Sequence, residues 1–174
     1  MNDSTPSSRR DFLKTTGRLA TASALSSVAV PAVYAAGSDL IQVALIGCGG
    51  RGTGAAANAL ATKGGPMKLV AMADVFPNRL KDSHARLQGK NGANDKVDVP
   101  ADRQFAGFDA YRKAIDLLRP GDIAMCTTRA YIRPVHVEYA VKKGRNIFME
   151  KSFAVDGPGI RRVLQAGKEA QKKN

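Results

Sequence analysis

Residues 41–52 are Ile41-Gln42-Val43-Ala44-Leu45-Ile46-Gly47-Cys48-Gly49-Gly50-Arg51-Gly52, and they are the most informative part of the chain. The apolar first half of this stretch is typical of a strand buried on both faces, and G-x-G-x-x-G follows directly. Gly47 would turn the chain off the strand, Gly49 would let backbone approach a pyrophosphate, and Gly52 would let the next helix pack closely. The pyrophosphate would lie on the free N–H groups of that helix. We therefore predict a cofactor-binding loop at Gly47, Gly49, Gly50, Arg51 and Gly52.

An acidic residue follows at the distance expected for a dinucleotide-binding fold. Residues 53–62 are compatible with a helix, residues 68–73 with a second apolar strand, and Asp74 ends that strand about 20 residues past the last glycine. A carboxylate there accepts hydrogen bonds from the ribose hydroxyls and repels a 2′-phosphate. Asp74 therefore favours NAD over NADP, although Arg79 is near enough in sequence to reach a phosphate. The alternative is a tight turn that binds no dinucleotide, and the combination of strand, glycines, helix and acid argues against it.

The first 35 residues have the pattern of an export signal. Ser8-Arg9-Arg10-Asp11-Phe12-Leu13-Lys14 is a twin-arginine run, an Ala/Ser-rich stretch over residues 19–33 follows, and small residues end at Ala35 and Ala36. An amphipathic cytosolic helix would not confine the charges to the start. The stretch is also too short and polar to span about 30 Å of hydrocarbon. We predict a Tat signal peptide over residues 1–35, cleaved after Ala35 or Ala36, and a periplasmic protein comprising residues 36–174.

Export by this route has a consequence for the cofactor. The Tat route resembles a carrier of folded cargo, so NAD could be loaded in the cytoplasm before export. Because the periplasm offers little free NAD, we expect the cofactor to be held tightly and recycled in place.

The remainder of the chain alternates between helical and strand patterns, which is typical of a parallel sheet with helices on both faces. The fold class predicted is α/β, a Rossmann-type doubly wound parallel sheet. The predicted helices span residues 77–87, 109–118, 134–143 and 159–172, and the predicted strands include Phe105 and residues 123–126 and 146–149. Residues 90–102 are predicted to be a surface loop. Residues 127–134, which begin with Thr127 and Thr128, form the loop at the topological switch point, where ligands bind.

Composition argues against several other functions. The formal net charge is +12, and it remains +10 without the first 35 residues, which carry four basic and two acidic groups. The basic residues are scattered over predicted helices without interleaved aromatic side chains, so solvated helix faces explain them better than nucleic-acid binding. Cys48 and Cys126 do not form a disulfide framework and are predicted to be small buried side chains. No Cys/His spacing indicates a metal site, and no Ser-His-Asp order indicates acyl transfer.

Several motifs in the second half of the chain resemble one family. They are the Cys126-Thr127-Thr128 loop, Val135-His136-Val137-Glu138-Tyr139-Ala140, the helix stop at Gly144, and Phe148-Met149-Glu150-Lys151. Together with the glycine loop they resemble the glucose-fructose oxidoreductase/inositol dehydrogenase (Gfo/Idh/MocA) family, from about Ile41 to the C-terminus. The resemblance is greatest to exported members that carry a Tat signal.

This resemblance implies an oxidoreductase that acts on a sugar or cyclitol hydroxyl by hydride transfer. It implies that Lys151 is catalytic, assisting proton movement at the hydroxyl, that Glu150 neighbours the cofactor or sugar, and that His136 lies on the cofactor side. By spacing alone, Glu150 and Lys151 would be an ordinary solvated pair, and His136 would equally well be a packing histidine at the start of its helix. Oxidising an alcohol requires a hydride acceptor and a proton acceptor on oxygen. A lysine, with an ordinary pKa of about 10.4, suits that task when desolvation beside the positive nicotinamide lowers its pKa.

The sequence departs from the family pattern in three respects. Ser152 follows Glu-Lys where proline is usual, so we expect altered geometry there, and Arg129 and Ala130 replace a common proline in the switch-point loop. The family also adds a second α/β domain that carries most sugar contacts and usually the dimer face. We therefore expect this chain to be a cofactor domain without its substrate domain, a truncated product or half of a split protein, acting with a partner or as an oligomer.

Three functions remain open from the sequence. The first is the oxidoreductase domain. The second is a hydrolase that uses bound NAD to oxidise a sugar transiently, eliminate a glycosidic substituent and reduce the product. The third is a nucleotide-binding protein without catalysis, which Ser152 and the length of the chain favour.

Overall fold

The computed structural model describes residues 39–89 and 94–173, and the segment in which the Tat signal is expected lies outside them. The strands are β1 (Ile41–Ile46), β2 (Met67–Asp74), β3 (Gln104–Ala106), β4 (Ile123–Cys126) and β5 (Asn146–Met149). The α-helices are α2 (Gly50–Leu60), α3 (Pro77–Gln88), α4 (Ala110–Asp116), α5 (Arg133–Lys142) and α6 (Gly157–Gln171), and the 3₁₀ turns are η2 (Asn94–Lys96) and η3 (Ala101–Arg103).

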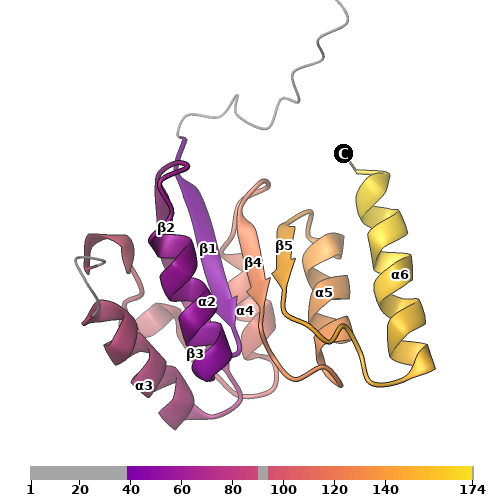
Figure 1. Cartoon of the computed structure of the whole chain (residues 1–174), viewed down its shortest axis with the longest axis horizontal. Coiled ribbons are helices and arrows are strands. Elements are labelled where there is room, and N and C mark those ends of the chain that lie inside the picture. The colour runs from indigo at the N-terminus through magenta and orange to yellow at the C-terminus, as the bar shows by residue number, and fades with distance from the viewer. Residues whose placement is uncertain (1–38, 90–93, 174) are drawn as a thin grey trace, which may run out of the picture. The chain divides into compact units, whose positions relative to one another are not determined.

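The strands form one parallel sheet in the order β3-β2-β1-β4-β5, which is the predicted doubly wound arrangement (Figure 1). β1 lies at the centre, where Ile46 pairs with Ala73 of β2 on one side and with Cys126 of β4 on the other. The chain passes from β1 to β2 in one direction and returns to the other side of β1 through β4. This reversal places a topological switch point between β1 and β4, at the carboxyl ends of the strands.

Two apolar cores explain why the buried residues 43–46 of β1 form a continuous apolar run. Val43 and Leu45 pack against α2 and α3 on one face of the sheet, and Ala44 and Ile46 pack against α4 and α5 on the other. Successive side chains of a strand point to opposite faces, so a strand covered on both sides must be apolar at every position. The helices flanking the sheet in Figure 1 supply this cover.

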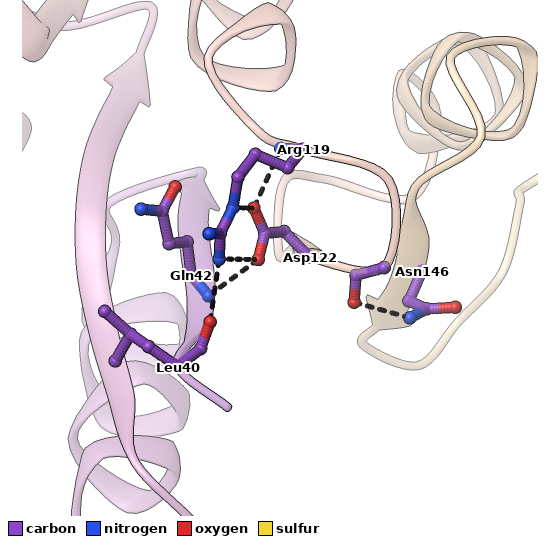
Figure 2. A network of polar contacts seen from close by, with 6 residues as sticks. Leu40, Gln42, Arg119, Asp122 and Asn146 are labelled. Atoms are coloured by element: carbon purple, nitrogen blue, oxygen red, sulfur yellow. Dashed lines mark hydrogen bonds and ion pairs between the residues drawn. The ribbon is translucent and has the colours of Figure 1, made fainter. Parts of the chain in front are cut away.

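A polar network at the amino ends of the strands fixes the sheet opposite the switch point (Figure 2). The carboxylate of Asp122, just before β4, accepts hydrogen bonds from the backbone of Gln42 at 2.9 Å and from the Arg119 guanidinium at 3.1 and 3.2 Å. Arg119 also donates to the carbonyl of Leu40 at 2.7 Å, and Asn146 donates to the carbonyl of Gly121 at 2.8 Å. The network therefore joins the starts of β1, β4 and β5.

The charge of Asp122 is stabilised although its side chain is only 4% exposed. Burial alone would disfavour the carboxylate. Hydrogen bonds from the Arg119 side chain and from the backbone of Gln42 and Arg119 outweigh burial and hold the pKa of Asp122 below its usual value.

Two elements differ from the sequence prediction. The first helix begins at Gly50 rather than at residue 53, because the Thr53 N–H closes the first helical turn on the Gly49 carbonyl at 2.9 Å. The described part of the predicted loop over residues 90–102 is not a bare surface loop. Buried Val97 bridges to Leu69, and the backbone N–H of Asp98 donates to the Leu69 carbonyl at 2.8 Å, so this segment covers the β2 side of the core.

Several apolar side chains on the β5 side of the sheet are exposed. β5 forms the sheet edge, and Phe148 is 43% exposed on the face that carries α2. α6 packs against α5 and buries Ala166 there, while Ile160 and Leu164 are exposed. None of the helices in residues 39–89 and 94–173 combines the length and apolarity needed to cross a bilayer.

Candidate functional site

A cleft of about 940 Å³ lies at the carboxyl ends of β1, β2, β4 and β5. Its size is within the range of ligand pockets, which is about 300–1,000 Å³. Ten of the eleven residues singled out from the sequence line it, namely Gly47, Gly49, Gly50, Arg51, Gly52, Asp74, Thr127, Thr128, Glu150 and Lys151. Residues up to 104 positions apart in the chain therefore meet around one space, because parallel strands end at the same edge of the sheet.

Two of the loop glycines are required by close backbone contacts. Gly47 has φ +99°, a conformation that L side chains rarely adopt, and a Cβ there would lie 2.7 Å from the Thr128 nitrogen. A Cβ on Gly52 would lie 2.0 Å from the Gly47 oxygen and 2.4 Å from Thr127 Oγ1. The predicted close packing of helix and turn is therefore present. By contrast, a Cβ on Gly49 or Gly50 would meet no protein atom within 4 Å, so both leave space beside the cleft.

The amino end of α2 is suited to an anion. The N-cap residue Gly49 has no side chain to cap the helix, and the first turn carries no acidic residue. The first N–H groups of a helix lack partners within the helix and carry its positive dipole end. These groups line the cleft between Gly49 and Gly52, which is the geometry in which backbone binds phosphate.

Asp74 is fixed in place by backbone donors. Its Oδ2 accepts the Cys48 N–H at 2.6 Å, and its Oδ1 accepts the Phe76 N–H at 2.9 Å. A carboxylate has about four acceptor positions, so each oxygen can still receive a hydroxyl hydrogen from a ligand. The Arg79 guanidinium lies 4.8 Å from the centre of the Phe76 ring and lines the same cleft.

The hydroxyls of Thr127 and Thr128 bond to protein groups. The single O–H of Thr127 is shared between the carbonyls of Ile46 at 3.1 Å and Gly47 at 2.7 Å, so it holds the glycine turn against the β4 loop. Thr128 Oγ1 bonds to Nδ1 of His136 at 3.0 Å. Both residues shape the cleft wall through these bonds.

His136 lies behind Thr128 and does not line the main cleft. It is 5% exposed, its ring centre is 4.3 Å from that of Tyr111, and it borders a separate, mainly apolar cavity of about 270 Å³. Burial, aided by the nearby positive charge of Arg133, lowers the pKa of His136 to about 4. The imidazole is therefore neutral at pH 7.

Glu150 and Lys151 stand on the opposite side of the cleft from Asp74, at the end of β5. Glu150 Oε2 lies 3.7 Å from Arg51 Nε, which links the end of β5 to the glycine loop. Lys151 is exposed and lines the cleft, so the described residues do not desolvate it as the sequence led us to expect. The peptide bond between Lys151 and Ser152 is cis.

Arg133 is a site residue that the sequence analysis missed. It is the first residue of α5, lines the cleft, and is only 3% exposed. Its guanidinium donates to the carbonyls of Thr128, Glu150 and Ser152. The one signal in the sequence is an arginine directly before Pro134 in the switch-point loop, and the pattern does not show that it is buried.

The charges around the cleft favour an anionic ligand. Six lining side chains are basic and three are acidic, namely Arg51, Arg79, Arg86, Arg129, Arg133 and Lys151 against Asp74, Asp82 and Glu150. A cleft lined mainly by one sign of charge concentrates ligands of the opposite sign.

The two cysteines are not candidates for a reactive group at the site. Cys48 and Cys126 are free and buried, and burial raises the thiol pKa of Cys126 to about 12 and that of Cys48 further. Thiols with such raised pKa values are unreactive at neutral pH. In the described part of the chain, no group of three or more His, Cys, Asp or Glu side chains is placed to hold a metal ion.

The chain is similar to solved dehydrogenase structures, whereas no protein-family model and no curated protein matches it. Myo-inositol 2-dehydrogenase from Lactobacillus plantarum has 22% sequence identity and a TM-score of 0.55, over 75% of this chain and 33% of that one. The WlbA dehydrogenase from Bordetella pertussis, in complex with NADH and UDP-GlcNAcA, has 20% identity and a TM-score of 0.57, over 77% of this chain and 34% of that one. Levoglucosan dehydrogenase in complex with NADH has 18% identity and a TM-score of 0.55, over 74% of this chain and 32% of that one.

These similarities establish a shared fold. The chain has the α/β, Rossmann-like sheet that occurs in these dehydrogenases, and it spans about a third of their length.

Proposed function

We propose that this chain is the NAD-binding domain of an exported oxidoreductase that removes a hydride from a hydroxyl-bearing carbon of a sugar or cyclitol. The observation that carries the proposal is the convergence of the glycine loop, Asp74 and the Glu150-Lys151 pair on one cleft at the switch point of the sheet. The fold neighbours are dehydrogenases, one of myo-inositol and two solved with NADH, which is the class that the sequence motifs resemble.

The residues of the cleft fit the parts of a dinucleotide in order. Asp74, held by two backbone donors, would accept the hydroxyls of the adenosine ribose. The amino end of α2 and the Arg51 side chain would bind the pyrophosphate. The nicotinamide half would then extend across the switch point toward the ends of β4 and β5. The open space at Gly49 and Gly50 suits the close approach of the diphosphate.

The bound cofactor would supply the hydride acceptor, and the chain's own groups would handle the proton. Lys151 is the candidate to receive the hydroxyl proton or to donate a hydrogen bond to the developing alkoxide. Because it is exposed among the described residues, the substrate or a further part of the protein would have to exclude water from it. The ion pair between Glu150 and Arg51 would connect the backbone next to Lys151 to the glycine loop.

Substrate, partners and location belong to the same proposal. A substrate domain or partner subunit would supply most contacts to the sugar, since the matched part of this chain makes up only 33% and 34% of the length of two neighbours with this fold. The twin-arginine segment supports export to the periplasm with NAD already bound. Asp74 supports NAD as the cofactor, and Arg79 in the same cleft is the feature that would admit NADP.

A second candidate function is nucleotide binding without catalysis. The exposed position of Lys151 favours it, because a solvated lysine is a poor base at neutral pH. Replacement of Lys151 by alanine separates the two functions. In an oxidoreductase assayed with its substrate domain or partner supplied, Lys151→Ala abolishes hydride transfer and leaves NAD affinity nearly unchanged. A pure binder shows no hydride transfer with or without the substitution, and its NAD affinity is also unchanged.

The direct test is to identify the nucleotide in the full chain purified from the cytoplasm. Absorbance and mass spectra of the ligand released on denaturation should show NAD or NADH at a near-equal molar amount. Calorimetric titration of the stripped protein with NAD, NADP and ADP-ribose would then rank the ligands. A folded protein that neither retains nor binds any of them would refute the proposal.

A further inference from the structure

Arg133 is unusual for a charged residue at the start of a surface helix. Its side chain is 3% exposed, and its backbone N–H also bonds to the Arg129 carbonyl at 3.1 Å. Nη1 donates to the carbonyls of Glu150 and Ser152, and Nη2 donates to the carbonyl of Thr128. A buried guanidinium is expected to be paired with an acid, so its surroundings call for a physical explanation.

No carboxylate lies within ion-pair distance of this guanidinium in the described part of the chain, and the Glu150 carboxylate is instead directed to Arg51. Burial lowers the pKa of Arg133, with the negative charge of Glu150 among the opposing effects. An arginine remains charged in proteins, so backbone carbonyl dipoles must stabilise the buried charge. Nε has no hydrogen-bond partner among the described residues. Such an arrangement is expensive for stability alone, which suggests that it serves the site.

The three carbonyls belong to two loops that leave the sheet side by side. Thr128 follows β4, and Glu150 and Ser152 follow β5, its neighbour in the sheet. Glu150 and Ser152 flank Lys151 on both sides. A single rigid group therefore holds the backbone on either side of the candidate catalytic lysine and joins it to the switch-point loop.

We propose that Arg133 is a positioning residue that fixes the backbone around Lys151 and the cleft wall beside the nicotinamide half of the cofactor. The role in cofactor binding rests on the function proposed above. Asp74 ends β2, which lies on the other side of β1 from β4 and β5, so the adenosine half would be distant from Arg133 and the nicotinamide half near it. The planar fork of arginine can reach carbonyls on both loops at once, whereas the single ammonium group of lysine cannot.

The test compares two ligands that differ in the nicotinamide half. Full-length wild type, Arg133→Lys and Arg133→Gln are titrated with NADH and with ADP-ribose. We expect both variants to raise the Kd for NADH about tenfold, the size expected for losing one charge-assisted hydrogen bond, and to change the Kd for ADP-ribose less than twofold. Arg161→Gln, which removes an exposed arginine of α6 outside the cleft, is the matched control and should change neither.

Equal weakening of both ligands, or no weakening, would overturn the nicotinamide-side role, because a defect of folding or of net charge acts on both ligands alike. Retained ADP-ribose binding also shows that the variants fold.

A second readout requires no cofactor. Lysines are labelled by reductive ¹³C-methylation, and the Lys151 signal is assigned with Lys151→Arg. We expect one sharp Lys151 signal in wild type and a shifted, broadened signal in Arg133→Gln, with other lysine signals unchanged. An unchanged Lys151 signal would refute positioning. If wild type binds neither nucleotide but the Lys151 signal responds, the positioning role holds and the proposed function fails.

Discussion

The backbone N–H of Cys48 donates to Oδ2 of Asp74 at 2.6 Å, which ties the glycine loop directly to the acid that ends β2. The second carboxylate oxygen accepts the Phe76 N–H, so the side chain cannot rotate without losing one bond. The acid therefore fixes the shape of the glycine loop, and its charge faces the cleft.

Asp74→Asn should weaken NAD binding about tenfold. An amide presents one acceptor oxygen, so its NH₂ group would face either a backbone N–H or the ribose hydroxyls. The same change removes the repulsion of a 2′-phosphate, so the preference for NAD over NADP should narrow. Kd values for both nucleotides by calorimetry check this. Asp102→Asn, an exposed acid outside the cleft, is the control, and an unchanged NAD Kd in Asp74→Asn would contradict the ribose role.

Gly52→Ala should destabilise the protein by about 3 kcal/mol or more and abolish nucleotide binding. The new Cβ would lie 2.0 Å from the Gly47 oxygen, a backbone atom that cannot move without opening the turn. Gly54→Ala is the matched control in the same helix, because its Cβ would meet no atom within 4 Å, and it should raise stability by up to about 1 kcal/mol. Urea unfolding measures the free energy of unfolding of both variants. Similar values would show that the backbone around Gly47 and Gly52 shifts to admit the new methyl group.

Asp122→Asn should lower the free energy of unfolding by about 2 kcal/mol at pH 7, because the charged acceptor of the network in Figure 2 is lost. Asp116→Asn removes an exposed carboxylate that pairs with Lys143 and accepts a hydrogen bond from the Tyr139 hydroxyl, and it should lower the free energy of unfolding less than Asp122→Asn does. The lowered pKa of Asp122 means that its contribution is present above its unfolded pKa and is lost as the pH falls through its folded value. Denaturant unfolding at pH 7 compares the variants. Equal losses of unfolding free energy in Asp122→Asn and Asp116→Asn would show that the buried network contributes no more than an exposed ion pair.

His136 should titrate near pH 4 in NMR spectra of the folded protein. Its folded pKa lies below the unfolded value of about 6.5, so below that pH the unfolded chain takes up a proton that the folded chain does not. Stability should be unaffected by this group above pH 6.5 and fall by up to about 3 kcal/mol as the pH drops toward 4. His136→Asn, which keeps an acceptor or donor for Thr128, should remove that part of the pH dependence. A titration near 6.5 would contradict the buried, neutral imidazole.

The sequence predicted the sheet and the site cleft because both depend on local patterns. A strand buried on both faces must be apolar, and the glycines mark where the chain turns with φ above zero or approaches other backbone, as Gly47 and Gly52 do. The bounds of β4 and β5 agree with the prediction for the same reason. The helix start at Gly50 could not be predicted from propensity, since glycine disfavours helix and only the closing bond from Thr53 to Gly49 sets the first turn.

The α/β alternation, the glycine loop and the acid at the end of the second strand follow from the sequence alone, because periodicity and turn chemistry act over a few residues. The exposure of Lys151, the position of His136 behind Thr128 and the burial of Arg133 against three carbonyls depend on tertiary packing. Burial and hydrogen-bond partners arise from residues distant in the chain, here from loops after β4 and β5 that meet because adjacent parallel strands end side by side.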